Sequence, residues 1–285
     1  MKFTVQSLVD SFRGTSSPPI MFIKINNAIN DPQSSLIKVG KVISEDSSLS
    51  ARLLKLVNSS FYGFPKRIGS ISEAVFLVGS HQIRDLALVT TMMKVFDGIP
   101  KDIVNMEMFW LHSLAVGVGA KAIAESMGES QLERFFVAGV LHDIGRLILY
   151  SRAPSESRKI LERASQEKRF LVEIEYEELN FSHTEIGRAL IDAWKLPSFF
   201  NEITEYHHAP EKAMHYPIET AVVHLADVLV HALQYGSSGE LYVPKLKNES
   251  WDKLNLSQFQ LPKIIKMIDR DVKAVAHLLH PHTEK

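Results

Sequence analysis

The stretch VLHDIGRLIL, residues 140–149, places His142 beside Asp143 in an otherwise apolar run. Burying an imidazole next to a carboxylate costs free energy unless each side chain finds a partner. A hydrogen-bond network, an ion pair or a metal ion would each satisfy the two groups. The sequence therefore predicts that other polar side chains fold against this pair.

Four other segments supply candidate partners, which are His112 in FWLHSLAVG, His183 in FSHTEIG, His207 and His208 in EYHHAP, and Asp227 in VVHLADVLV. The chain has no cysteine, so any metal ligand must be a histidine or a carboxylate. Imidazole with carboxylate suits iron, manganese, nickel or zinc, and Asp143 can bridge two ions. We expect this set to bind one or two divalent transition-metal ions, with iron or manganese preferred to nickel or zinc.

Each of these residues also has a simpler interpretation when it is taken alone. A single histidine on a helix, such as His112, is more often a hydrogen-bonded core or surface residue than a ligand. His207 and His208 are also compatible with a solvated loop, and Asp227 with a helix cap or an ion pair. The simpler interpretation must be invoked separately at every position, whereas one metal centre explains all of them together.

Two further histidines do not decide between a metal centre and ordinary polar contacts. His224 lies three residues before Asp227 and His231 four residues after it, so all three share one face of a helix. His224 and His231 are therefore either neighbours of the ligands or ordinary polar partners. Gly145, which follows the His142–Asp143 pair, is also explained by close packing of helices.

The elements that must position these side chains are helical. Apolar residues recur at helical spacing in nearly every segment, and glycine and proline fall between segments, so we predict an all-α protein. Ser70 and Glu73 have the spacing of a capping box, which predicts a helix start at Ile71. We expect further helices at about 34–45, 48–58, 81–96, 107–127, 131–150, 156–168, 198–207 and 217–235.

The helix that carries His183 has clear start and stop signals. Ser182 and Glu185 form a second capping-box pattern, which places His183 in the first helical turn. The helix should end before Pro197, because the residue before a proline disfavours the helical conformation. Residues 235–250 are rich in turn formers, and one or two closing helices follow them.

Composition argues against two classes of partner. The 285 residues include 32 basic and 33 acidic side chains, and the net charge of −1 gives no field that would attract DNA or an anionic membrane. Asp10 and Arg13 interrupt the N-terminal segment before it reaches the length of a signal peptide. No window approaches the roughly 20 apolar residues of a spanning helix. We therefore expect a cytoplasmic protein with neither a DNA nor a membrane partner.

The ordered set from His112 through His142 and Asp143 to Asp227 resembles the HD superfamily of metal-dependent phosphohydrolases. With His183 and the His207–His208 pair, it resembles the dinuclear ligand set of the HD-GYP branch, which degrades cyclic dinucleotides. The run ending in LLKLVNSSFYG, and LIDAWKLP ahead of EYHHAP, are similar to a different relative. They resemble the HDOD family, the HD-related output domain of bacterial signalling proteins, over roughly residues 5–230.

The HDOD resemblance implies an HD-like helical bundle packed against an N-terminal helical lobe. The expected division is an N-terminal lobe at residues 1–105, the HD-like lobe at 106–236, and a connection with closing helices at 237–285. HDOD modules are regarded as regulatory or scaffolding outputs, so we expect a signalling module with a protein partner and a nucleotide or phosphate ligand. The alternative is a metal-dependent phosphohydrolase or cyclic-dinucleotide phosphodiesterase.

The resemblance also implies an assignment of ligands. One ion would take His112, His142, Asp143 and Asp227, and a second would take Asp143, His183, His207 and His208. Where HD-GYP enzymes carry a lysine three residues after the aspartate, this chain has Arg146, whose charge would steady a phosphate oxygen. If the protein is an enzyme, Asp143 and Arg146 are the expected catalytic residues. His215-Tyr216-Pro217 replaces the Gly-Tyr-Pro motif, and Met108 stands where some members carry a glutamate for a third ion.

Overall fold

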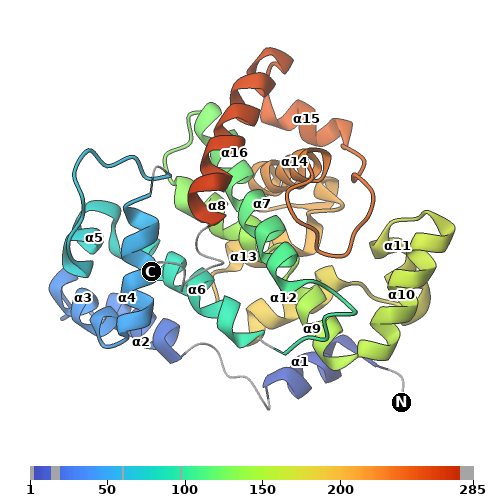
Figure 1. The fold of residues 1–285 in the computed structure, drawn as a ribbon, viewed down its shortest axis with the longest axis horizontal. Helices are drawn as coiled ribbons and strands as arrows, with labels where there is room; N and C mark the ends of the chain where they lie inside the picture. Colours follow the sequence, from blue (N-terminus) through green and yellow to red (C-terminus); the bar gives the residue numbers. More distant parts are fainter. Residues whose placement is uncertain (1–2, 14–19, 60, 97, 277–285) are drawn as a thin grey trace. The chain divides into compact units, whose positions relative to one another are not determined.

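The computed structural model describes residues 3–13, 20–59, 61–96 and 98–276, and these residues form helices and connections without a β-strand (Figure 1). The predicted all-α class is confirmed. Among the described residues, no helix combines the length and the apolar character that crossing a bilayer requires. The helices are α1 (Val5–Arg13), α2 (Ile20–Asn30), α3 (Leu36–Ser44), α4 (Ser47–Val57), α5 (Ile71–Val78), α6 (Ser80–Val95), α7 (Met106–Ser126), α8 (Leu132–Leu141), α9 (Ile144–Arg152), α10 (Pro154–Glu167), α11 (Leu171–Leu179), α12 (His183–Ala193), α13 (Ser198–Tyr206), η1 (Pro210–Lys212), α14 (Pro217–Leu233), α15 (Asn248–Leu254), η2 (Gln258–Gln260) and α16 (Leu261–Val275).

The chain divides into two compact units. One unit takes residues 1–16 and 98–268, and the other takes residues 17–97 and 269–285. The first of these, here called the histidine unit, contains every candidate ligand. The division of the chain at residues 105 and 236 into separate domains stays a prediction.

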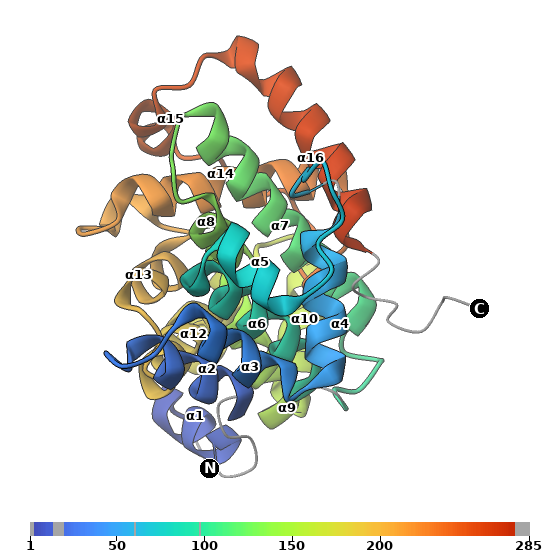
Figure 2. The same cartoon turned by 90° about the vertical axis from the view of Figure 1, so that its left-hand side faces the viewer.

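The unit of residues 17–97 is a bundle of α2 to α6. In it α3 packs against α2 and α5, and α6 packs against α2, α4 and α5 (Figure 2). The predicted start of α5 is confirmed, because the Ser70 side chain accepts a hydrogen bond from the Glu73 amide at 3.1 Å. Glu73 itself accepts from the amide of Gly69, one residue before the cap.

The histidine unit is arranged around α7. Helices α8 and α14 pack against α7, and α12 packs against both α9 and α13 (Figure 1). Nearly all of α7 between Phe109 and Ala124 is buried, which explains its apolar character on every face. The candidate ligands therefore come from helices that meet in one core.

The single helix predicted for residues 131–150 is wrong. The chain forms α8 and α9 with a break at His142 and Asp143, and the backbone of Asp143 leaves the helical region with φ −99° and ψ 13°. Apolar residues continue through the break, so periodicity alone could not reveal it. Adjacent residues of a continuous helix point about 100° apart, and the break allows both side chains to face one site.

Helices α9 and α12 pack in close contact at Gly145. A Cβ atom built on Gly145 would lie 1.9 Å from the carbonyl oxygen of His183 and 2.6 Å from the amide nitrogen of Gly187. Only a residue without a side chain allows the two backbones to approach this closely. This contact brings Asp143, at the start of α9, beside His183, at the start of α12.

The capping box predicted at Ser182 is confirmed. The Ser182 amide donates to the Glu185 carboxylate at 2.8 Å, and α12 begins at His183 as expected. Helix α12 ends at Ala193, and Lys195 then takes a left-handed conformation with φ 54° ahead of Pro197. Helices α1, α2 and α11 were not predicted, and α11 contributes a carboxylate to the site.

Candidate metal centre

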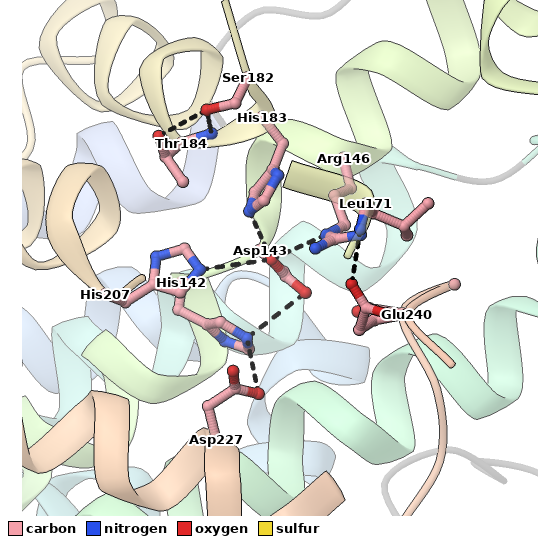
Figure 3. Close-up of polar contacts among 12 residues, drawn as sticks. His142, Asp143, Arg146, Leu171, Ser182, His183, Thr184, His207, Asp227 and Glu240 are labelled. Carbon is pink, nitrogen blue, oxygen red and sulfur yellow. Dashed lines mark hydrogen bonds and ion pairs between the residues drawn. The ribbon is translucent and has the colours of Figure 1, made fainter. Parts of the chain in front are cut away.

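Three imidazoles turn their Nε2 atoms toward the carboxylate of Asp143 (Figure 3). The Oδ1 atom of Asp143 lies 3.1 Å from Nε2 of His183 and 3.6 Å from Nε2 of His207. Its Oδ2 atom lies 3.4 Å from Nε2 of His142. His208 completes this group, because one ligand atom from each of Asp143, His183, His207 and His208 falls within 4.8 Å of all the others.

A second group forms around Asp227 of α14. Its Oδ1 atom lies 3.3 Å from Nε2 of His112 and 3.7 Å from Nε2 of His142. The same oxygen lies 2.9 Å from Nδ1 of His231, one turn later on α14. His112, His142 and Asp143 form a third group, which links the first two. The structure thus brings the seven predicted ligands together, and it adds His231.

The opposite nitrogen of each imidazole around Asp143 is already used. Nδ1 of His142 lies 2.6 Å from the Gly139 carbonyl oxygen, and Nδ1 of His207 lies 2.9 Å from the Thr204 carbonyl oxygen. Carbonyl oxygens only accept, so both Nδ1 atoms carry the proton and donate it. The Nε2 atoms therefore present lone pairs to the site, as metal-binding histidines do.

The Nε2 atoms that face the site have no hydrogen-bond partner. Among the described residues, the buried side-chain atoms without one include Nε2 of His112, His142, His183, His207 and His208, and Oδ1 of Asp227. A lone pair on imidazole that faces a carboxylate oxygen at 3.1–3.7 Å is repelled by it. A cation between the two atoms turns this repulsion into coordination, so the donor set fits a metal ion.

The buried charges also favour a bound cation. The carboxylates of Asp143, Glu175 and Asp227 are buried, and among the described residues of this cluster Arg146 is the one buried guanidinium. Burial opposes charge on His231, but Asp227 outweighs it and raises its pKa to about 9, so this ring is charged at pH 7. With the other imidazoles neutral, three negative and two positive charges leave an excess of one negative charge. Buried charges need neutralising partners, and a cation supplies the missing charge.

The pKa values follow from burial and from these carboxylates. Burial lowers the pKa of His207 to about 4 and that of His112 to about 4, so both rings are neutral ligands at pH 7. Burial also opposes charge on His142, but the nearby Asp143 and Asp227 outweigh it and raise its pKa. Burial would raise the pKa of Asp143, but Arg146 and His142 hold it well below its usual range.

Arg146 lies at the centre of the buried cluster. Its Nε donates to Oδ1 of Asp143 at 3.0 Å, and its Nη1 lies 4.0 Å from Oε1 of Glu175. The guanidinium is 1% exposed. It holds two carboxylates in place, and its contact with a phosphate oxygen stays a prediction.

Glu175 of α11 is a site residue that was not predicted from the sequence. Its Oε2 atom accepts hydrogen bonds from the backbone amide of His183 at 2.9 Å and from Nδ1 of the same residue at 2.6 Å. Glu175 thus fixes both the ring and the main chain of His183. Its segment, EIEYEEL, contains four carboxylates, and nothing in the spacing marks which one faces inward.

His224 and His231, whose roles could not be decided from the sequence, make different contacts. His224 uses both ring nitrogens, because its Nδ1 donates to the His207 carbonyl at 2.7 Å and its Nε2 accepts from the Lys247 amide at 3.1 Å. It has no nitrogen left for a metal and connects the backbone of His207 to the segment at Lys247. His231, in contrast, contacts Asp227 inside the cluster.

Replacing Glu175 by glutamine is expected to weaken metal binding about 10- to 100-fold, the usual effect of removing the carboxylate behind a metal-bound histidine. The amide is neutral and can present its NH2 group to Nδ1 of His183, so the ring loses its fixed orientation. Metal affinity is measured by competition with a chelator. Glu177→Gln on the exposed face of α11 is the control, and an equal affinity in both variants would contradict the role of Glu175.

Comparison with known proteins decides the family. A model of the HDOD domain matches residues 16–210, which is more than half of the chain. The chain belongs to the HDOD family. This HDOD chain is 27% identical over 229 residues to an uncharacterized protein of Treponema pallidum (strain Nichols), and the match covers 80% of this chain and 44% of that relative. It therefore spans less than half the length of that curated relative.

Solved structures share the HDOD fold. An HDOD domain protein of unknown function from Geobacter sulfurreducens is 26% identical, with a TM-score of 0.76 and 98% of each chain covered. A protein from Shewanella amazonensis SB2B, named "Putative metal-dependent phosphohydrolase", is 18% identical, with a TM-score of 0.68 and 97% of this chain and 98% of that one covered. At that identity the second likeness shows the fold alone.

Proposed function

We propose that this HDOD protein is a signalling module that holds a mono- or dinuclear metal centre. The observation that supports this most directly is the convergence of unpartnered Nε2 atoms on Asp143. Imidazole and carboxylate donors favour iron or manganese, with nickel or zinc as alternatives. The proposed ligands are His112, His142, Asp143 and Asp227 for one ion, and Asp143, His183, His207 and His208 for the other.

The regulatory role rests on the family and on the burial of Arg146. HDOD domains are regarded as regulatory or scaffolding outputs. In this chain the Arg146 guanidinium, which would contact a phosphate in an enzyme, is buried between two carboxylates. The ligands come from α7, the α8–α9 break, α12, the turn after α13, and α14. Occupancy of the site therefore bears on how all of these helices pack. A protein partner that binds the histidine unit would sense that packing.

A metal-dependent phosphohydrolase is the second candidate. One observation favours it: a pocket lined by His208 lies beside the centre. Metal ions, when bound, supply an acidified water and a Lewis acid for phosphate oxygens. In that case Asp143 would be the ligand common to both ions, Arg146 would position Asp143, and Glu175 would orient His183.

Metal analysis combined with a turnover assay separates the two functions. The whole chain is purified without oxygen, its metal content is measured by elemental analysis, and it is assayed with a generic phosphodiester and a cyclic dinucleotide after addition of manganese or iron. We expect one or two ions per chain and no turnover. Turnover that Asp143→Asn abolishes would establish the enzyme instead, and a metal-free protein would overturn both proposals.

A further inference from the structure

The pocket beside the centre has a volume of about 230 Å³ and belongs entirely to the histidine unit. Its lining includes the apolar residues Phe170 and Pro244 and the polar residues His208, Lys245 and Lys247. His208 joins the pocket to the centre. It is partly exposed, its Nε2 is buried without a hydrogen-bond partner, and one of its ring nitrogens lies within 4.8 Å of a ligand atom of Asp143.

The acidic side chains of the pocket are already engaged. The Glu240 carboxylate accepts hydrogen bonds from the backbone amides of Leu171, Leu241 and Tyr242 at 2.8, 2.9 and 3.1 Å. Glu173 pairs with Arg169 at 3.1 Å. Three amide donors therefore stabilise the Glu240 carboxylate, and Glu173 shares the Arg169 guanidinium with Glu167 and Glu177.

The basic side chains of the pocket are free. Neither the Lys245 nor the Lys247 ammonium forms an ion pair with any residue that the structure describes. Two lysine side chains without an ion pair in the lining, next to a candidate cation site, favour an anion.

The segment that carries the lysines is tied to the centre. The Lys247 amide donates to Nε2 of His224, and Nδ1 of His224 donates to the carbonyl of His207. His207 is itself one of the imidazoles at Asp143. A ligand held by the lysines would therefore act on the backbone that orients a metal ligand, which makes the pocket suited to sensing as well as to binding.

We propose that this pocket binds a small phosphate monoester, with the phosphate facing Lys245 and Lys247. The inference deepens the proposed function, because it names the ligand class of the same centre. The volume of about 230 Å³ lies below the roughly 300–1,000 Å³ of pockets that enclose drug-sized ligands. It suits a phosphate on a small group and leaves no room to enclose a cyclic dinucleotide.

Calorimetric titration of the whole, metal-analysed chain tests the proposal. The probes are inorganic phosphate, adenosine monophosphate and a cyclic dinucleotide, given to the unaltered chain and to the double variant Lys245→Ala/Lys247→Ala. Lys253→Ala/Lys266→Ala, with the same charge change at exposed positions, is the matched control. We expect phosphate or the monophosphate to bind, and the pocket variant to bind roughly tenfold more weakly or worse while its metal content stays unchanged.

The outcomes separate this inference from the metal centre. Inorganic phosphate that binds as tightly as the nucleotide identifies free phosphate as the ligand, and a preference for the nucleotide identifies an ester; both support the pocket. Binding that is equal in the pocket and control variants, or tighter binding of the dinucleotide, overturns it. A metal-free chain with lysine-dependent binding overturns the metal centre and retains the pocket, whereas a metal-loaded chain that binds none of the probes does the reverse.

Discussion

Replacing Gly145 by alanine is expected to abolish metal binding although no ligand is changed. The added Cβ would meet the His183 carbonyl at 1.9 Å, so α9 and α12 must move apart. Asp143 and His183, whose ligand atoms are 3.1 Å apart, lie at the ends of these two helices and must separate with them. Overpacking a core costs about 1–3 kcal/mol, and a clash between backbones belongs at the upper end of that range.

The measurement is metal content by elemental analysis together with the thermal unfolding midpoint. Gly69→Ala is the matched control, since its Cβ would approach nothing closer than the Glu73 carboxylate at 3.9 Å. We expect the control to keep its metal and its midpoint. A Gly145→Ala variant that retains both would show that the α9–α12 contact does not set the geometry of the centre.

Replacing Asp143 by asparagine is expected to reduce bound metal to less than about a tenth of its content in the unaltered chain, because the charge shared by both ligand groups is lost. The same change leaves Arg146 with one carboxylate fewer in a buried site, and breaking a buried pair costs about 3–5 kcal/mol. Both the metal content and the free energy of unfolding should therefore fall. Chemical denaturation at equal protein concentration measures the second quantity.

Asp192→Asn is the control for this change. Asp192 lies 3.7 Å from Arg188 at an exposed position, where an ion pair contributes less than about 1 kcal/mol. Circular dichroism confirms that each variant is folded before metal is measured. A folded Asp143→Asn chain with an unchanged metal content would remove Asp143 from the centre and require a different set of ligands.

The parts of the fold that could be predicted from the sequence are those with local causes. The start of α12 follows from Ser182 and Glu185, which bond to each other within one turn, and that start places His183. The break at His142 and Asp143 has no such local signal, because the residues on both sides are apolar. The break follows from tertiary packing, which brings α9 against α12 at Gly145.

The candidate site, too, could be predicted from the sequence only in part. Residue types and order indicated the histidines and aspartates, and the structure brings all seven of them together, although their role as ligands stays a prediction. Glu175 could not be chosen among the acidic residues of its segment, because only the path of the chain decides which one reaches His183. His224 and His231 share a helix face with Asp227, yet different segments reach them. The backbone of His207 and Lys247 contacts His224, whereas the ring of His112 on α7 lies against His231.

The spread of the candidate ligands along the chain has a thermodynamic consequence. They extend from residue 112 to residue 227, all inside one unit, in a protein that has no cysteine. An ion held by several of them closes long loops at once and so restricts the unfolded chain in the way that a set of disulfides would. Removal of the ion would then lower the free energy of unfolding of this unit, so the supply of the ion would contribute to its stability in the cell.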